Sequence, residues 1–423
     1  MSRRRAPLAL RALLVLGALC LAGAARADAV LDWNELLLAA IRATRPAAPQ
    51  AARQIAIVNV AAFDAANAAD GRPFVAYACD GPAAARAAPD TAATAAAAAA
   101  MQALFPDLAK RTPALAARIA GRAAPQQGDE AAVALGRACA AAVLAGRAGD
   151  GADATPEPFT GGTEPGRWRP TPPGFAAGLL PGWGNVALWV AGDADVAVPP
   201  PPPPGSRPWL ENFNAVKSIG SPDGASFTER QAVTARFWAD EDGSDTPPGH
   251  WVAIARGIAL RRPSSVVEHA RLFAQLGLAL ADTATVVWAA KYRYASWRPV
   301  TAIRVAGTLG DPLVAGDAEW TPFLVTPPSP DYPSGHSAFA AAAARVLQAA
   351  FGGDAIDFDA IGIDPQRSRV SHHFARLSDA AEEAGLSRIY GGVSFYFSHR
   401  AGAAAGQAVA ERVLAGRLRP SGK

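Results

Sequence analysis

Three short segments within residues 288–394 constrain this chain most, because their side chains suit one site although they lie far apart in the sequence. The first holds two cations seven residues apart, Lys291 and Arg298. The second, residues 333–336, reads Pro-Ser-Gly-His at an expected helix start, and the third adds Arg388. Three fixed positive charges, a hydroxyl and a helix N-terminus together bind a tetrahedral oxyanion once water is excluded. We therefore expect the chain to fold so that these segments meet in one oxyanion pocket.

The first 27 residues have the pattern of a secretory signal peptide. Arginines open the segment, an apolar run from Leu8 to Ala24 follows, and a small-x-small cleavage site ends at Ala27. We expect cleavage after Ala27 and a secreted or periplasmic protein; a retained membrane anchor is the alternative. No later apolar run reaches the roughly 20 uninterrupted residues of a membrane span, so we expect no membrane association after cleavage.

Loss of this segment changes the charge balance. It removes five arginines and no acidic residue, which leaves 35 basic and 37 acidic residues and turns a formal charge of +3 into −2. No cluster of Lys and Arg remains that would indicate nucleic-acid binding. Cys79 and Cys139 remain as an even pair, and their spacing leaves open a disulfide or two buried thiols. Neither lies in a metal-ligand pattern.

Apolar residues recur at helical spacing through most of the chain, and alternating β-branched runs are nearly absent. The sequence therefore predicts an all-α fold. The expected helices are 30–43, 49–68, 83–104, 113–123, 128–145, 228–238, 249–260, 264–291, one that begins at Pro299, 337–351, 372–384 and 399–418.

The composition divides the chain into an N-terminal helical region (28–147), a Gly/Pro-rich connection (148–208) and a C-terminal helical region (209–423) that carries the pocket. The connection contains six consecutive prolines, which favour a stiff polyproline II segment. It also contains Trp168, Trp183 and Trp189, which a solvated linker would not carry. We expect the connection to pack on the helices and the regions to form one domain.

The three segments resemble the superfamily of vanadium-dependent haloperoxidases and type 2 phosphatidic acid phosphatases. Its motifs are Lys, six residues and Arg-Pro; Pro-Ser-Gly-His; and Ser-Arg, five residues and His. The stretches 30–38, 56–67 and 246–251 extend the resemblance to the secreted bacterial haloperoxidase-like proteins. The resemblance implies helical bundles of the haloperoxidase and acid phosphatase type.

The resemblance also implies a role for each matching side chain. Lys291, Arg298 and Arg388 would hold the oxygens of vanadate or phosphate. The Ser334 hydroxyl and the Gly335 N–H would add hydrogen bonds. His336 would act as acid and base, and Trp288 would line the halide side.

The chain departs from the family pattern at Ser394. The family has a histidine there, which binds vanadium in the peroxidases and is the nucleophile in the phosphatases. A serine hydroxyl is a poor neutral ligand for vanadium and needs a base to act as a nucleophile. His399 lies five residues downstream, and a ligand role for it would require the intervening chain to loop back. Ser329 is a second departure, because chloroperoxidases place a phenylalanine at that position beside the halide.

Two further expectations concern the same part of the chain. Ser398 is expected to be the N-cap of the last helix. His372 and His373 are expected at a solvated helix start.

Three functions fit this pattern. The first is a vanadium-dependent haloperoxidase that oxidises halide with hydrogen peroxide. The second is a phosphatidic-acid-phosphatase-type phosphomonoesterase with phosphate in the same site, and the third is a non-catalytic oxyanion-binding protein. All three imply small-molecule partners and no nucleic acid, and they leave homo-oligomerisation open.

Overall fold

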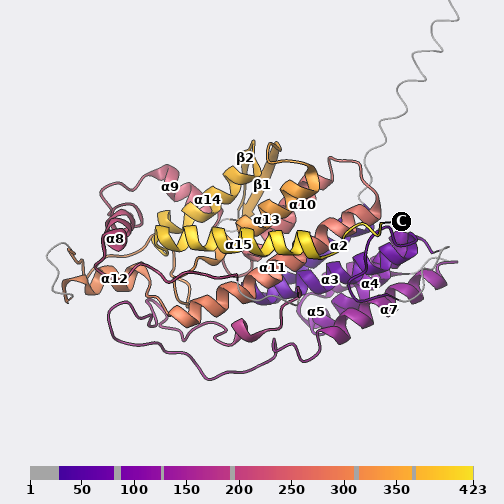
Figure 1. Ribbon diagram of the computed structural model, residues 1–423, viewed down its shortest axis with the longest axis horizontal. Coiled ribbons are helices and arrows are strands. Elements are labelled where there is room, and N and C mark those ends of the chain that lie inside the picture. Colours follow the sequence, from indigo (N-terminus) through magenta and orange to yellow (C-terminus); the bar gives the residue numbers. More distant parts are fainter. Residues whose placement is uncertain are drawn as a thin grey trace, which may run out of the picture.

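The computed structural model describes residues 28–80, 87–124, 128–190, 196–308, 314–363 and 368–422. The expected signal peptide lies outside these ranges. The described chain is built of helices around one long central helix, with a single two-stranded sheet in the described ranges (Figure 1). The prediction of an all-α fold is therefore confirmed.

The longest helix, α11 (Val266–Tyr294), forms the centre of the core. It begins with a capping box in which Ser265 and Glu268 each accept a hydrogen bond from the other's backbone N–H. It packs on α3 (Ala48–Ala69) and α13 (Gly335–Phe351). Among the described residues, α11 alone has the length and composition to cross a bilayer, but 89% of that window is buried inside the protein, as in a core helix.

The N-terminal helices cover one end of α11 (Figure 1). Their bounds follow the sequence prediction closely, with two exceptions. The short helix at Leu108–Arg111 was not predicted, and the helix expected from residue 83 begins at Pro89; residues 81–86 lie outside the described ranges. Cys79 and Cys139 form a disulfide, which decides the alternative that the sequence left open. The elements are α2 (Ala29–Thr44), α4 (Pro89–Leu104), α5 (Leu108–Arg111), α6 (Pro113–Ala123) and α7 (Glu130–Gly146).

The connection expected at 148–208 is mostly irregular, with one short helix, η2 (Trp183–Asn185). Trp168, Trp183 and Trp189 are all buried, which confirms that the segment packs on the helices. Sequence reasoning missed α8 (Arg207–Ile219), which follows the proline tract and buries Trp209 in a second, smaller apolar cluster.

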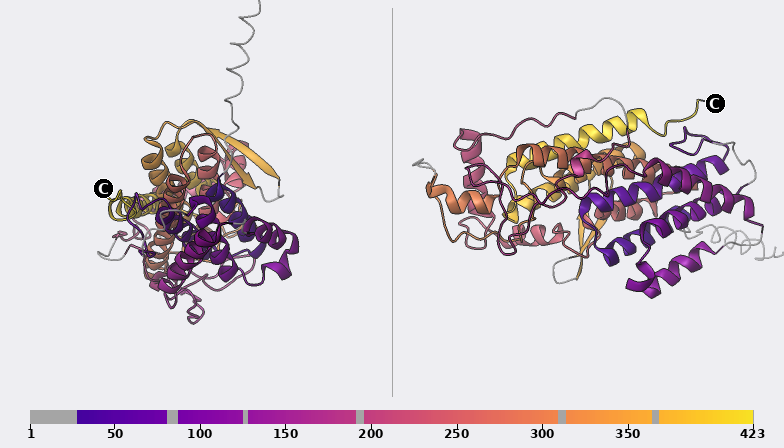
Figure 2. Two further views of the ribbon diagram at one scale, coloured as in Figure 1. Left: turned by 90° about the vertical axis from the view of Figure 1, so that its right-hand side faces the viewer. Right: turned by 90° about the horizontal axis from the view of Figure 1, so that it is seen from below.

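The C-terminal helices surround the other part of α11 (Figure 2). Helices α13 and α15 pack so closely that a Cβ added to Gly402 would lie 2.3 Å from the backbone oxygen of Ser334. This contact fixes the start of α13 against the first turns of α15. The remaining elements are α9 (Glu229–Phe237), α10 (Thr246–Ala259), α12 (Pro299–Val305), η3 (Ala306–Thr308), α14 (Leu377–Tyr390) and α15 (Tyr396–Gly416).

Two predictions near the end of the chain are wrong. Strands β1 (Phe358–Ile363) and β2 (Arg369–Phe374) pair as an antiparallel hairpin, so His372 and His373 lie on a strand and not at a helix start. His372 stacks on Phe237 at 3.9 Å between ring centroids and contacts Glu383. The last helix begins earlier than expected, with Phe395 as its N-cap in place of Ser398.

Candidate functional site

The predicted pocket residues line one cavity of about 770 Å³. They arrive from the last turns of α11, the start of α12, the start of α13, the end of α14 and the turn before α15. The cavity residues that the sequence predicted are Trp288, Lys291, Arg298, Ser329, Ser334, Gly335, His336, Arg388 and Ser394. No group of three or more His, Cys, Asp or Glu side chains in the described ranges could hold a metal cation. Three of the cavity residues, Lys291, Arg298 and Arg388, are cations, which suits an anion.

Lys291 is buried on the last turn of α11. Its ammonium donates to the backbone oxygens of Pro330, at 2.7 Å, and of Asp331, at 3.0 Å. An ammonium has three N–H donors, so one remains for the cavity. Burial lowers the pKa of Lys291 well below its ordinary value; the nearby Arg298 adds to this, and the Asp331 carboxylate opposes it.

Arg298 is the N-cap residue of α12, where Pro299 as the first helical residue holds it in an extended conformation. Its guanidinium is fixed by the backbone oxygens of Ser329 and Val393, each at 2.7 Å, and by the hydroxyls of Ser329 and Ser394. Such a fork of bonds orients a planar cation rigidly.

Arg388 completes the set of cations from the last turn of α14. Its guanidinium donates a long hydrogen bond, 3.5 Å, to the backbone oxygen of Trp238, and the side chain lines the cavity. Burial lowers the pKa of Arg388 to about 10, so the guanidinium stays charged at neutral pH.

His336 follows Gly335 in the first turn of α13. Its Nε2 is buried and has no hydrogen-bond partner in the described part of the chain, while the ring bonds the backbone of Ala239. Burial and the charges of Arg388, Arg298 and Lys291 lower the pKa of His336 well below its ordinary value. The imidazole is therefore neutral at pH 7 and can accept a proton at Nε2.

Ser394 lies on the turn before α15, and its hydroxyl is already engaged. It accepts a long hydrogen bond, 3.4 Å, from Arg298, and it lies close enough to the Asp331 carboxylate to lower the pKa of that group. Ser329 bonds the other side of the same guanidinium. The ring of Trp288 lies 5.9 Å from the Lys291 ammonium, on the apolar side of the cavity.

His399 does not line the cavity but lies behind Ser334. Its Nδ1 is 3.0 Å from the hydroxyl of Ser337, and its Nε2 is 3.2 Å from a carboxylate oxygen of Glu382. Both ring nitrogens are thus held by side chains outside the pocket. The geometry does not place His399 where a ligand from position 394 would be.

Sequence reasoning missed a counter-charge behind the cavity and part of the cavity lining. Asp331, fully buried, lies beside Arg298 and receives hydrogen bonds from the Ser398 hydroxyl and the Phe395 N–H. The loop 239–243 adds three acidic residues at the rim, and Leu179 from the Gly/Pro-rich connection covers another side, bound through its backbone oxygen to Trp288. An acid within a Pro-rich segment gives no periodic signal, so these contributions could not be read from the sequence.

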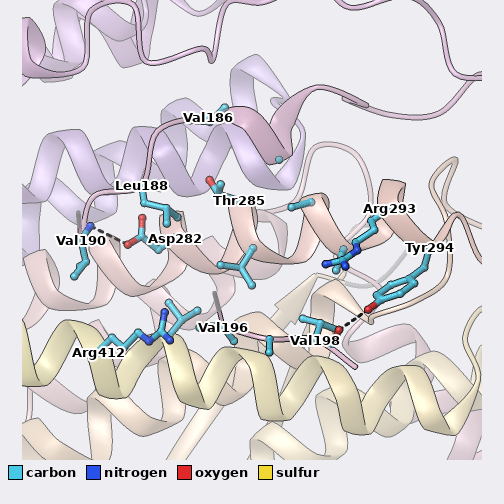
Figure 3. Close-up of a pocket in the computed structure, with 16 residues that line it drawn as sticks. Val186, Leu188, Val190, Val196, Val198, Asp282, Thr285, Arg293, Tyr294 and Arg412 are labelled. Atoms are coloured by element: carbon cyan, nitrogen blue, oxygen red, sulfur yellow. Dashed lines mark hydrogen bonds between the residues drawn. The ribbon is translucent and has the colours of Figure 1, made fainter. Parts of the chain in front are cut away.

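A second cavity, of about 580 Å³, lies between α11, α15 and the segment that leads to the prolines (Figure 3). Its polar groups hold that segment in place. Asp282 accepts hydrogen bonds from the N–H groups of Trp189 and Val190, and Tyr294 donates to the Val198 oxygen. Burial raises the pKa of Asp282 to about 6. We interpret this cavity as an anchor for the segment.

Comparison with known proteins agrees with the geometry of the first cavity. Residues 271–419, which contain all the predicted pocket residues, match the VCPO second helical-bundle domain. The chain is also 27% identical over 264 residues to the vanadium chloroperoxidase of Curvularia inaequalis. In sequence the chain is thus similar to the vanadium haloperoxidases, above all over their second helical-bundle domain. That match covers 48% of this chain and only 42% of the chloroperoxidase.

Solved structures of vanadium haloperoxidases share the fold over most of the chain. A bacterial vanadium-dependent iodoperoxidase superposes with a TM-score of 0.77 at 24% identity, covering 93% of this chain and 97% of the other. The holo form of a bacterial vanadium-dependent chloroperoxidase gives a TM-score of 0.65 at 18% identity, with 93% of each chain covered. The helical-bundle fold of this haloperoxidase-like protein therefore extends well beyond the matched domain.

Proposed function

We propose that this protein binds vanadate in the first cavity and oxidises halide with hydrogen peroxide. One observation carries the proposal: three buried cations, Lys291, Arg298 and Arg388, converge on a cavity that also contains the unpartnered Nε2 of His336. Burying three cations around one space is costly unless an anion compensates them. Asp331 supplies one negative charge behind the cavity, so a divalent oxyanion balances the other two.

The start of α13 also fits an oxyanion. The first N–H groups of a helix have no acceptor within the helix and carry a partial positive charge. A Cβ added to Gly335 would lie 3.5 Å from the Trp288 ring, an ordinary contact, so the protein alone leaves room for a larger residue. The absence of a side chain at Gly335 is thus explained best by close approach of a ligand to its backbone.

The residues fit the oxyanion but supply no nitrogen ligand at position 394. The Ser394 hydroxyl accepts from Arg298, so we propose that vanadate is held by ion pairs and hydrogen bonds alone. Bound vanadate would act as a Lewis acid that activates peroxide without changing its own oxidation state. We expect weaker vanadate binding than in relatives with histidine there.

The chain's own residues then have separate tasks. Lys291, Arg298 and Arg388 would neutralise the negative charge and draw electrons from the oxygens they contact. The neutral His336 would accept at Nε2 the proton that hydrogen peroxide releases on binding. Trp288 and Ser329 would line the approach of the halide, and we propose bromide or iodide because Ser329 replaces the phenylalanine of the chloroperoxidases.

A phosphomonoesterase is the second candidate, with phosphate in place of vanadate. The observation that favours it is the proximity of the Ser394 hydroxyl to the Asp331 carboxylate, because a carboxylate next to a hydroxyl can serve as its base. The opposing observation is that Arg298 lies against the same carboxylate, 3.6 Å away, and stabilises its charged form. We therefore place the peroxidase first.

The test uses the purified protein with orthovanadate, hydrogen peroxide and either bromide or iodide, and follows halogenation of a dione. A parallel assay measures hydrolysis of p-nitrophenyl phosphate, and calorimetry measures vanadate and phosphate binding. Vanadate-dependent halogenation supports the proposal. Hydrolysis without halogenation would favour the phosphatase, and oxyanion binding with neither activity would favour the non-catalytic binding protein.

We also propose that the protein is exported to the periplasm or secreted. Two features support this: the signal-peptide pattern of the first 27 residues and the disulfide between Cys79 and Cys139, which forms in oxidising compartments. Mass spectrometry of the protein recovered from cell fractions would test the location and the cleavage after Ala27.

A further inference from the structure

A chain of four side chains leads from the cavity to the protein surface. Ser334 lines the cavity, and its Oγ is 2.9 Å from the Oγ of Ser337. Ser337 contacts Nδ1 of His399 at 3.0 Å, and Nε2 of His399 contacts Glu382 at 3.2 Å. The first three side chains are buried, whereas the side chain of Glu382 is 53% exposed.

The His399 ring occupies space that the missing side chain of Gly385 leaves open. A Cβ added to Gly385 on α14 would lie 2.1 Å from Nδ1 of His399 and 3.1 Å from the Ser337 hydroxyl. Any larger residue at 385 would therefore displace the imidazole from Ser337. Three helices, α13, α14 and α15, meet at this point.

The direction of the hydrogen bonds follows from donor and acceptor chemistry. The Glu382 carboxylate only accepts, so Nε2 of His399 carries a proton and donates to it. When His399 is neutral, its Nδ1 is an acceptor and takes the proton of Ser337. Ser337 must then accept from Ser334, and Ser334 turns its lone pairs toward the cavity.

Protonation of His399 reverses the two bonds that Ser337 makes, while Nε2 of His399 still donates to Glu382. Nδ1 then donates to Ser337, Ser337 donates to Ser334, and the Ser334 hydroxyl is free to donate into the cavity. An oxyanion needs donors, so it binds the second arrangement better than the first.

We propose that His399 is a positioning residue that sets, through Ser337, whether Ser334 donates to or accepts from the oxyanion. Binding of the anion then takes up a proton at His399, although this residue never touches the anion. The inference rests on the proposed oxyanion pocket and deepens it. These hydrogen-bonded side chains, on α13, α15 and α14, would couple anion binding to pH.

The surroundings of His399 fix the direction of this coupling. Burial lowers the pKa of His399, and Arg400 on its own helix lowers it further, whereas Glu382 from α14 raises it. Among the described residues these are the charged groups that act on the ring; α13 contributes the Ser337 hydroxyl, and Tyr396 lies 5.4 Å away ring to ring. The free protein therefore holds a neutral His399 at pH 7, and anion affinity rises as pH falls.

Sulfate is the suitable probe, because it is a tetrahedral dianion whose charge does not change near neutral pH. Calorimetric titration of the full protein at pH 6 to 8, in buffers of different ionisation enthalpy, gives both the affinity and the protons taken up. The key variant is Ser337→Ala, which interrupts the chain but keeps His399 and the pocket residue His336. Glu382→Gln, at the surface, removes the charge that supports protonated His399, and His373→Gln on the exposed hairpin is the matched control.

We expect wild type and His373→Gln to take up more protons per sulfate than Ser337→Ala and Glu382→Gln. The pH dependence of wild-type affinity should approach tenfold per pH unit as the uptake at His399 approaches one proton. If Ser337→Ala does not fold, Glu382→Gln alone decides. Sulfate binding with equal proton uptake in wild type and the folded variants would overturn the inference alone; absence of sulfate binding by wild type would overturn the proposed pocket and the inference together.

Discussion

The carboxylate of Asp331 lies 3.6 Å from the guanidinium of Arg298, and both side chains are buried. Burial raises the pKa of Asp331, while Arg298 and the Ser398 hydroxyl oppose that rise. One carboxylate oxygen, Oδ1, has no hydrogen-bond partner in the described ranges. Asp331 is therefore the counter-charge of the cationic cavity, held from behind by the start of α15.

Replacing Asp331 with asparagine should destabilise the protein by about 3 kcal/mol, because Arg298 and Lys291 lose a buried counter-charge. Sulfate in the cavity would replace part of that charge, so it should stabilise the variant more than it stabilises wild type. Urea unfolding with and without sulfate measures both effects. Equal stability of variant and wild type without sulfate would contradict this role of Asp331.

Replacing Ser394 with histidine should raise vanadate affinity by at least about tenfold, because the imidazole adds a nitrogen ligand that the serine cannot supply. Sulfate affinity should change little, since sulfate forms no bond to nitrogen. Ser394→Asn is the control, because it enlarges the side chain without providing an imidazole. Equal vanadate affinity in Ser394→His and Ser394→Asn would show that position 394 does not face the bound metal.

Oxyanion affinity should fall as pH rises through the pKa of Lys291. Burial holds that pKa well below the ordinary lysine value in the free protein, and only the charged ammonium attracts the anion. The loss should therefore occur at a lower pH than that of an exposed lysine. Lys291→Met should bind sulfate weakly and lack this alkaline loss, whereas Lys217→Met, at a half-buried lysine away from the cavity, should retain it. Sulfate titrations from pH 7 to 10 compare the three proteins.

Much of the fold could be predicted because helix boundaries carry local signals. Helix α6 begins at Pro113 and α12 at Pro299, as expected from the preference of proline for the first helical position. The hairpin escaped prediction because β2 combines two histidines with few β-branched residues, and its pairing with β1 is a tertiary contact. Helix α8 escaped because it directly follows the proline tract.

The candidate site likewise contains residues that sequence motifs predicted and residues that only the packing of the helices reveals. The sequence predicted that Lys291, Arg298 and Arg388 would meet, since three spaced motifs named them together. It could not predict Asp331 or the partner of His399, because these depend on how α13, α14 and α15 pack. Ser337 and His399 are 62 residues apart, and no pattern in the sequence links them.

Loss of the disulfide between Cys79 and Cys139 should cost about 4 kcal/mol, as expected when a bridge closing a loop of this length is opened. The bridge spans 60 residues and ties the segment after α3 to α7. Cys79→Ala and Cys139→Ala should each lower the free energy of unfolding by this amount. The double variant should lower it little further, because either change alone removes the bond. Denaturant unfolding of the three variants gives these differences. Additive losses would mean that the cysteines stabilise the fold independently of their bond.

Asp282 should make the protein less stable as pH rises from about 4 to about 6. Burial raises its folded pKa to about 6 from an ordinary 3.8, so in this window the folded state keeps a proton that the unfolded state has lost. The shift corresponds to at most about 3 kcal/mol. Asp282→Asn should remove this part of the pH dependence while lowering stability overall, because one amide oxygen must replace two carboxylate oxygens that bind Trp189 and Val190. Unfolding free energies at pH 4, 5, 6 and 7 give the slope of stability against pH. The same slope in wild type and Asp282→Asn would mean that other groups cause this pH dependence.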